Sequence, residues 1–155
     1  MANITTDKLL GRKLDFNEVL IVPQKSRISS RKDVTVRKTF SFPHSKNTWT
    51  GVPIAASNME TTGTIEMASK LQDHSVLTCL HKYYEPDEIP STLCPEFYAL
   101  SSGILDADLS RLDKLLQSLP NTKFICIDVA NGYMDKFVHT CKLLRNRHPN
   151  KIIIA

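Results

Sequence analysis

The sequence lacks the signatures of several large classes of protein. Its glycines stand at positions 11, 51, 63, 103 and 132, so neither GxGxxG nor GxxxxGK[ST] can occur, and a Rossmann or P-loop phosphate site in its usual form is excluded. No HExxH, GxSxG or CxxC motif is present either. The four cysteines therefore indicate neither a zinc site nor a disulfide scaffold. Cys79 and Cys126 lie inside apolar runs, and we expect them to be buried free thiols.

Long apolar stretches are also missing. The longest runs, such as 152–155, span only a few residues, so the sequence predicts no membrane-spanning segment. Residues 1–10 contain no hydrophobic region of a secretory signal, and we expect a cytoplasmic location. A chain of 155 residues with 41% hydrophobic and 23% charged residues fits one globular domain.

Positive charge is concentrated near the N-terminus. Residues 1–50 hold ten Lys and Arg against four Asp and Glu, whereas residues 51–155 hold ten against twelve. The segment 25–38 alone has six cations and one acid. No helix-turn-helix, zinc finger or aromatic ladder accompanies this segment, so we expect no nucleic-acid partner. A solvated basic face and a site for the phosphates of a small nucleotide both remain open.

Short apolar runs recur at regular intervals. Their starts are 24, 21, 27 and 28 residues apart, which fits a repeat of strand, loop, helix and loop. The runs are Val52–Ala56, Val76–Leu80, Phe97–Leu100, Phe124–Val129 and Ile152–Ala155.

The connecting segments have helical periodicity. Leucines within 108–119 and apolar residues within 134–147 each fall on one face at helical spacing, and a shorter pattern covers 65–71. The link from Tyr83 to Pro95 contains three prolines, so any helix there is expected to be brief.

Apolar strands that alternate with amphipathic helices predict a parallel sheet covered by helices. An open doubly wound sheet suits five strands, whereas a (β/α)8 TIM barrel needs eight strands and ~200 residues or more. Length favours the open sheet. The apolar strand 152–155 at the end of the sequence instead suggests a barrel truncated after about four βα units plus a fifth strand. In that interpretation, residues 1–50 are a basic segment leading into the barrel, and residues 51–155 are its first half.

Polar side chains follow each predicted strand. In a parallel sheet, ligands bind at the carboxyl ends of the strands, so these side chains predict a polar rim around a cleft. The strand ends read Ser57-Asn58-Met59-Glu60, His81-Lys82-Tyr83-Tyr84, Ser101-Ser102-Gly103 and Asp128-Val129-Ala130-Asn131-Gly132-Tyr133.

Three rim residues have more than one interpretation. Lys82 is either a surface lysine, a cation that attracts phosphate, or a Schiff-base amine. His81 is either a hydrogen-bonded structural histidine or a site residue. Asp128 is either held by backbone N–H groups or faces a ligand, and we favour the ligand.

Several of these motifs together resemble the guanosine monophosphate (GMP) reductases. The similarity runs in order over nearly the whole chain from Leu14 and includes Phe124-Ile-Cys-Ile-Asp-Val-Ala-Asn-Gly-Tyr133. That run distinguishes this sequence from the related inosine monophosphate (IMP) dehydrogenases, as do His81-Lys82 and Tyr84. Those enzymes usually insert a regulatory domain between strands two and three, and residues 81–96 leave no room for one. Further matching stretches are Leu14–Pro23, Ser30-Arg31, Gly51–Ile54, Asn58-Met59 and Gly63-Thr64.

The resemblance implies a (β/α)8 barrel, usually a homotetramer, that converts GMP to IMP and ammonia with NADPH and holds a potassium ion in a nearby loop. It implies that Ser30 and Arg31 contact NADPH from a neighbouring subunit. Lys82 and the stretch Asp128, Val129 and Ala130 would contact NADPH within the same subunit. Cations suit the phosphates of such a cofactor, and a strand-end carboxylate can accept hydrogen bonds from its hydroxyl or amide groups.

The chain also departs from the family. Glu60 replaces an aspartate, Tyr83 replaces a histidine, and residues 85–107 match weakly. The catalytic cysteine, its neighbouring threonine, the potassium loop and the phosphate-binding strands of the family belong to a second half that this sequence does not contain. We therefore expect no catalytic residue and no metal ligand here, and no activity from these 155 residues alone.

Two alternatives remain open. One is a non-catalytic half-barrel that binds nucleotides or regulates a full-length reductase. The other is a Schiff-base lyase in which Lys82 is the nucleophile.

Overall fold

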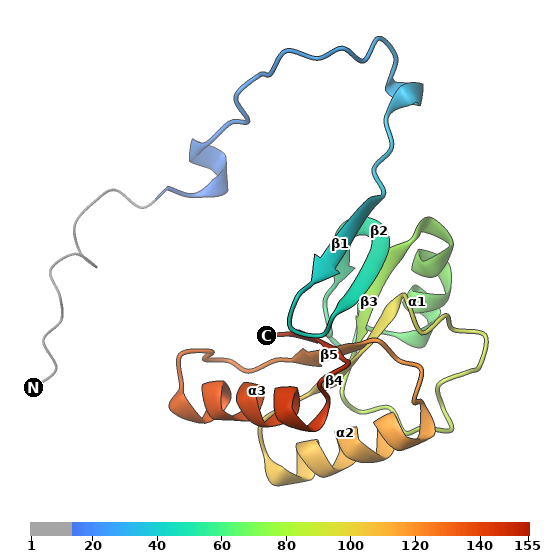
Figure 1. Cartoon of the computed structure of the whole chain (residues 1–155), viewed down its shortest axis with the longest axis vertical. Coiled ribbons are helices and arrows are strands. Elements are labelled where there is room, and N and C mark those ends of the chain that lie inside the picture. Colours follow the sequence, from blue (N-terminus) through green and yellow to red (C-terminus); the bar gives the residue numbers. More distant parts are fainter. Residues whose placement is uncertain (1–13) are drawn as a thin grey trace, which may run out of the picture. The chain divides into compact units, whose positions relative to one another are not determined.

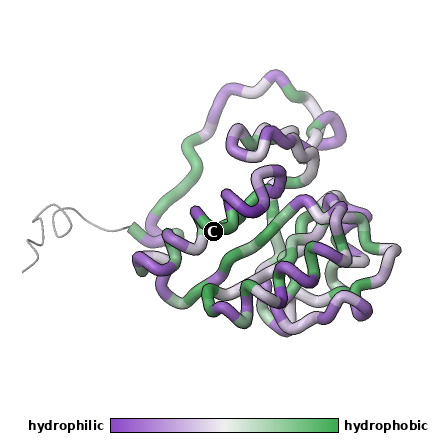
Figure 2. Tube along the Cα trace, turned by 60° about the horizontal axis from the view of Figure 1, so that its bottom comes forward, coloured by the Kyte–Doolittle hydropathy of each residue, from purple (hydrophilic) through white to green (hydrophobic). Residues whose placement is uncertain are grey.

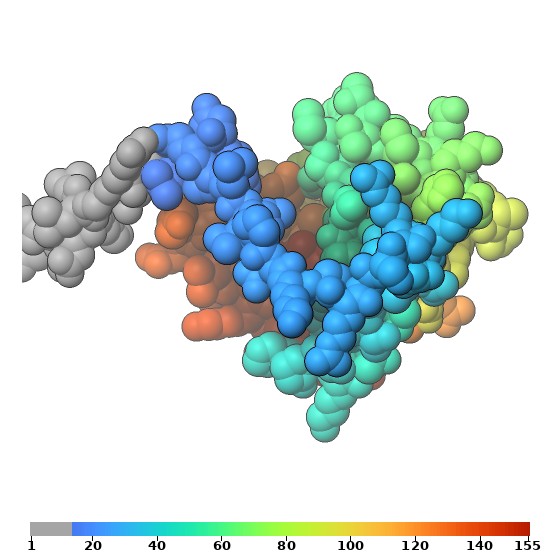
Figure 3. Space-filling view, turned by 90° about the horizontal axis from the view of Figure 1, so that it is seen from above, coloured from blue at the N-terminus to red at the C-terminus, as the bar shows by residue number. Residues whose placement is uncertain are grey.

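The computed structural model describes residues 14–155. The chain divides into two units, and the boundary falls between residues 34 and 35. Within the first unit, residues 14–34 contain two 3-10 helices, η2 (Phe16–Glu18) and η3 (Arg31–Asp33). Every residue from 14 to 34 is exposed. These residues are drawn as blue spheres in Figure 3. No helix within residues 14–155 has the length and apolar character needed to cross a membrane.

The second unit is built on one twisted sheet (Figure 1). Its strands lie in the order of the sequence, from β1 to β6. β1 pairs with β2 in antiparallel fashion, and each later strand pairs in parallel with the one before it. The strands are β1 (Lys38–Phe42), β2 (Asn47–Ala56), β3 (Val76–Leu80), β4 (Tyr98–Ser102), β5 (Phe124–Ile127) and β6 (Ile152–Ile154).

The predicted helices are confirmed. α1 (Ile65–Leu71) continues into η4 (Gln72–His74), while α2 (Asp106–Ser118) and α3 (Asp135–Arg147) connect the later strands. α1 begins at Thr64, whose Oγ1 accepts a hydrogen bond from the backbone N–H of Met67. The proline-containing link between β3 and β4 forms turns only.

Strand order decides between the two architectures that the sequence left open. A doubly wound sheet reverses its strand order and carries helices on both faces. Here the order never reverses, and the helices pack on one face only (Figure 1). This winding is that of a (β/α) barrel, and the parallel strands β2 to β6 form its first part.

Each face of the sheet has its own apolar core. Hydrophobic stretches, drawn in green, alternate with hydrophilic ones along the trace in Figure 2. On the helix-covered face, leucines of α2 and Leu144 of α3 pack against Leu100 and Ile125. On the inner face, Trp49 of β2 packs with Phe124 and with other residues of β3 to β6. Both faces of β3 and β5 are buried, and accordingly all their residues except Thr78 are apolar.

The hairpin of β1 and β2 was not predicted. Only 52–56 was recognised as a strand, whereas β2 begins at Asn47 and pairs back to β1 through a turn in which Lys46 has a φ of 56°. Two other boundaries also differ from the prediction. β4 spans 98–102 rather than 97–100, and β5 ends at Ile127, so Asp128 is the first residue beyond the strand.

Candidate functional site at the carboxyl ends of the strands

The predicted polar rim is confirmed as a cleft. The carboxyl ends of β2, β3, β4 and β5 meet around a cavity of about 490 Å³, within the usual size range of small-molecule sites. Three of the residues predicted for a cofactor in the same subunit, at positions 128–130, line it next to Lys82. Its lining is Asn58, Met59, Glu60, Thr61, Lys82, Tyr83, Ser102, Asp128, Val129 and Ala130.

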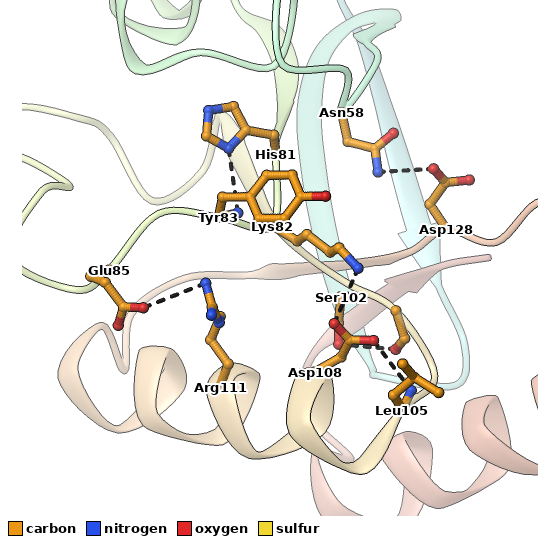
Figure 4. Close-up of polar contacts among 11 residues, drawn as sticks. Asn58, His81, Lys82, Tyr83, Glu85, Ser102, Leu105, Asp108, Arg111 and Asp128 are labelled. Carbon is orange, nitrogen blue, oxygen red and sulfur yellow. Dashed lines mark hydrogen bonds and ion pairs between the residues drawn. The ribbon is translucent and has the colours of Figure 1, made fainter.

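Lys82 extends from the end of β3 to an acidic partner on the first turn of α2 (Figure 4). Its Nζ lies 3.2 Å from Oδ1 of Asp108, and the two side chains are 39% and 18% exposed. A pair this accessible to water adds little to folding stability, about 0–1 kcal/mol. Its clearer effect is to hold the ammonium group at one place in the cleft.

Asp108 is held by its own local contacts. Its Oδ2 accepts a hydrogen bond of 3.3 Å from the backbone N–H of Leu105, so the carboxylate also stabilises the start of α2. Gly103 leaves room for this arrangement, because a Cβ there would collide with the Asp108 carboxylate. Sequence reasoning missed Asp108 as a site residue. The signal that would have found it is an acid in the first helical turn after a strand that ends at the rim.

Asp128 faces the cleft from the end of β5. Asn58 Nδ2 donates a hydrogen bond of 3.1 Å to its Oδ2, which links this carboxylate to the end of β2 (Figure 4). The Asp128 side chain is exposed, and its backbone N–H donates to the Ser102 carbonyl oxygen at 3.1 Å. The backbone is therefore fixed while the carboxylate can accept further hydrogen bonds. Val129 and Ala130 continue the wall, and the small side chain of Ala130 keeps the backbone accessible.

A tight loop places the rim residues that follow β2. The Gly63 N–H donates to the Met59 carbonyl oxygen at 2.6 Å, and the His81 N–H donates to the Gly63 carbonyl oxygen at 2.8 Å. A Cβ on Gly63 would collide with the Cys79 carbonyl oxygen, so only glycine lets the loop lie this close to β3.

His81 is part of an aromatic stack. Its ring lies 4.0 Å from that of Tyr84 with an interplanar angle of 17°, and the Tyr84 hydroxyl accepts a hydrogen bond from the backbone N–H of Ile65. The structure therefore supports the structural interpretation of His81. Tyr83 and Glu60, the two departures from the family pattern, both line the cleft, and Lys82 Nζ lies 5.6 Å from the centre of the Tyr83 ring.

Ser30 and Arg31 lie in the first unit. The Ser30 Oγ accepts a hydrogen bond of 3.2 Å from the backbone N–H of Lys32 and caps η3, which begins at Arg31. Both residues are exposed, and they line a shallow hollow of about 250 Å³ together with Ser26, Ile28, Ser29 and Val34.

The described residues form no conventional metal centre. Within 14–155, no group of three or more His, Cys, Asp or Glu side chains converges on a site for a metal ion. The four cysteines are free thiols, and Cys79 and Cys126 are buried, as predicted.

Comparisons with known proteins find extensive similarity to one enzyme family, although no family model matches the chain. It is 42% identical over 148 residues to GMP reductase 1 of Mus musculus, covering 92% of this chain and 43% of the relative. It is 43% identical over 149 residues to GMP reductase of Caenorhabditis elegans, covering 92% and 42%. The chain thus spans less than half the length of these relatives.

A solved structure has the same fold. The inosine 5'-monophosphate dehydrogenase of Legionella pneumophila superposes with a TM-score of 0.73 at 25% identity, covering 92% of this chain and 43% of that one. This likeness agrees with the barrel winding deduced from the strand order.

Proposed function

Because the chain matches the amino-terminal portion of the family of GMP reductases and IMP dehydrogenases, we propose that it supplies part of the NADPH site of a GMP reductase. In this proposal the complete protein converts GMP to IMP and ammonia in the cytoplasm, as a homotetramer with a bound potassium ion. Residues 51–155 form the first half of its barrel, and residues 1–50 lead into it. Neither the catalytic residues nor the potassium site lies in this chain.

One observation carries the proposal: Lys82 and Asp128 open into a single cleft at the carboxyl ends of parallel strands. The donor set fits NADPH. An ammonium group suits its anionic and carbonyl oxygens, and a carboxylate suits its amide and hydroxyl hydrogens. Bound NADPH supplies a hydride, while the protein supplies orientation and electrostatics.

Each residue of this chain then has a positioning role. The Lys82 ammonium, held by Asp108, binds an electron-rich oxygen of the cofactor. The Asp128 carboxylate, held by Asn58, orients a hydrogen-bond donor, and the backbone of Val129 and Ala130 forms the adjoining wall. Exposed Ser30 and Arg31 contact the cofactor of a neighbouring subunit.

Titration of the 155-residue chain with NADPH, followed by the fluorescence of the cofactor, tests this assignment. We expect Lys82→Met to weaken binding by about 10-fold or more, because hydrogen bonds to charged groups contribute ~1.5–3 kcal/mol. Lys114→Met is the matched control, since Lys114 is an exposed lysine of α2 outside the cleft. Equal affinities of Lys82→Met and the unmodified chain would refute the role of Lys82.

The activity of the complete protein needs a separate measurement. We expect no NADPH oxidation when the chain alone is given GMP, and turnover by the chain alone would contradict the proposal. The intact mass of the native protein, captured from its source cells, is expected to be roughly twice 17.5 kDa, as a complete barrel requires. A native species of 17.5 kDa would favour the half-barrel regulatory partner instead.

The ion pair argues against the Schiff-base lyase. Lys82 Nζ lies 3.2 Å from the Asp108 carboxylate and contacts it, so this nitrogen is not free to attack a carbonyl carbon. Borohydride should therefore trap no carbonyl substrate on Lys82.

A further inference from the structure

The turn between β5 and α3 holds two residues that the proposed function does not use. Asn131 and Gly132 directly follow Ala130, which lines the cleft, and both are exposed. An asparagine followed by glycine combines an electrophilic side-chain amide with the least hindered backbone nitrogen that a protein chain offers. The pair therefore has the components of an intramolecular reaction.

The side-chain carbonyl group of Asn131 is held in place and polarised. The backbone N–H of Tyr133 donates a hydrogen bond of 3.0 Å to Asn131 Oδ1 and so forms an Asx turn. The ring closed by this hydrogen bond contains the Gly132 nitrogen, so the side-chain amide is kept beside that nitrogen. The same N–H would stabilise the negative charge that develops on Oδ1 when a nucleophile adds to Cγ.

The Gly132 nitrogen is free to act as that nucleophile. Its N–H donates no hydrogen bond to any group within residues 14–155. No side chain crowds it either, because a Cβ at Gly132 would lie 3.6 Å from its nearest neighbour, Cε1 of Phe137. The nitrogen can therefore lose its proton to water or hydroxide and approach Cγ without breaking a contact of the fold.

Two other exposed asparagines in turns lack this freedom. Asn121 is followed by Thr122, whose N–H donates to a backbone carbonyl oxygen at 3.1 Å. Asn150 is followed by Lys151, whose N–H donates to a backbone carbonyl oxygen at 3.0 Å. In both cases the nitrogen is held by a hydrogen bond and carries a bulkier residue, which distinguishes Asn131 from them.

We propose that Asn131 is a site of spontaneous deamidation at the rim of the cleft. The Gly132 nitrogen bonds to Cγ of Asn131, the Cγ–Nδ2 bond breaks, and ammonia leaves with the proton of the Gly132 N–H. Water then opens the cyclic imide at one of its two carbonyl groups and gives aspartate or isoaspartate. In total, one amide and one water give one carboxylic acid and one ammonia, and no electron is transferred.

The product changes the charge of the cleft. The new carboxylate stands three positions after Asp128, on a rim that already carries the carboxylates of Glu60 and Asp128. Added negative charge repels the phosphates of an anionic ligand. The effect on NADPH rests on the proposed function, whereas the deamidation itself does not.

Peptide mapping of the 155-residue chain, incubated in neutral and in mildly alkaline buffer, tests the site. We expect the peptide that contains Asn131 to gain about one mass unit, faster in the alkaline buffer, with an equal amount of ammonia released. Asn121 and Asn150 are controls within the same sample and should react about 10-fold more slowly or less. Deamidation of Asn131 no faster than that of Asn150 would overturn the proposal.

Gly132→Ala tests the nucleophile. We expect deamidation of Asn131 to slow by about 10-fold or more, because the added Cβ hinders the approach of the nitrogen to Cγ. The fold should tolerate this change, since the Cβ meets Phe137 at an ordinary distance. An unchanged rate in Gly132→Ala would exclude the cyclic imide as the intermediate.

Asn131→Asp measures what the new charge does to the cleft. We expect NADPH affinity to fall by about 3-fold, because the added charge is partly screened by water and salt. Asn121→Asp, outside the cleft, is the matched control and should leave the affinity unchanged. Equal affinities of Asn131→Asp and the unmodified chain would refute the effect on the cleft. If the unmodified chain bound no NADPH, the proposed function would fail, and the mass measurement would still decide the deamidation.

Discussion

The two ends of the parallel sheet carry different kinds of side chain. At the amino ends of the strands, Trp49 packs against Phe40, Phe97 and Phe124 with ring centres 5.8–6.2 Å apart. At the carboxyl ends, the side chains are polar and partly exposed and surround a cleft. The comparison shows that packing residues and candidate ligand residues are separated along one axis of the barrel. Substitutions at the two ends should therefore have different effects.

The largest effect is expected at the aromatic end. Trp49→Ala removes a 6% exposed side chain and the hydrogen bond from its Nε1 to the Glu96 carbonyl oxygen. We expect a loss of about 3–5 kcal/mol in the free energy of unfolding, measured by urea denaturation. Tyr133→Ala, at a side chain 99% exposed, is the control and should change little. A loss below ~1 kcal/mol for Trp49→Ala would show that the aromatic cluster does not hold this end together.

Gly103→Ala tests the cleft end. The added Cβ collides with the Asp108 carboxylate and displaces the anchor of Lys82. We expect NADPH affinity to fall by about 10-fold, with a loss of stability of about 1–3 kcal/mol from overpacking. Gly132→Ala is the control, because its Cβ would meet Phe137 at an ordinary 3.6 Å. Equal affinities of the two variants would contradict the steric role of Gly103.

Tyr98→Phe tests the helix-covered core at the amino end of β4. The buried Thr122 hydroxyl donates a hydrogen bond of 3.0 Å to the Tyr98 hydroxyl oxygen, so the variant should lose about 1–2 kcal/mol of stability. Burial raises the pKa of Tyr98 above its usual 10.0. The unfolded state therefore loses this proton first, and the stability due to Tyr98 is present below pH 10.0 and declines as the pH rises above it.

The free energy of unfolding, measured from pH 8 to 11, tests whether stability falls as Tyr98 ionises. The stability of the unmodified chain should fall more steeply above pH 10 than that of Tyr98→Phe. Parallel curves for the two proteins would mean that Tyr98 ionises equally in the folded and unfolded states.

The smallest effect is expected for the ion pair itself. Asp108→Asn should cost no more than ~1 kcal/mol, because Lys82 is 39% exposed. A double-mutant cycle with Lys82→Met isolates the interaction of the two side chains from the helix-capping role of Asp108. A coupling well above 1 kcal/mol would assign Lys82 to the stability of the fold rather than to the cleft.

The sequence predicted the elements whose patterns are local. The leucines of α2 and the apolar strands β3, β5 and β6 are recognisable from spacing alone, and the rim follows from the polar residues after each strand. The hairpin of β1 and β2 was not predicted, for two reasons. The cations near Lys38 were interpreted only as part of a basic segment, not as part of a strand. The alternation of polar and apolar residues around Trp49 has a period of two, but it extends over only a few residues.

The missed site residues depend on contacts between distant parts of the chain. Asp108 meets Lys82 across 26 positions, and the approach depends on the absence of a side chain at Gly103. The burial of Cys79 and Cys126 was predictable from their apolar neighbours.

Trp49 is the one tryptophan of the chain, and it stands at the amino end of the barrel axis, whereas the proposed cofactor cleft opens at the carboxyl end. Tryptophan emits where the reduced nicotinamide ring absorbs. The chain therefore carries a natural energy-transfer donor at a fixed place in the fold. The efficiency of transfer to bound NADPH would measure how far along the axis the nicotinamide ring lies, without any label.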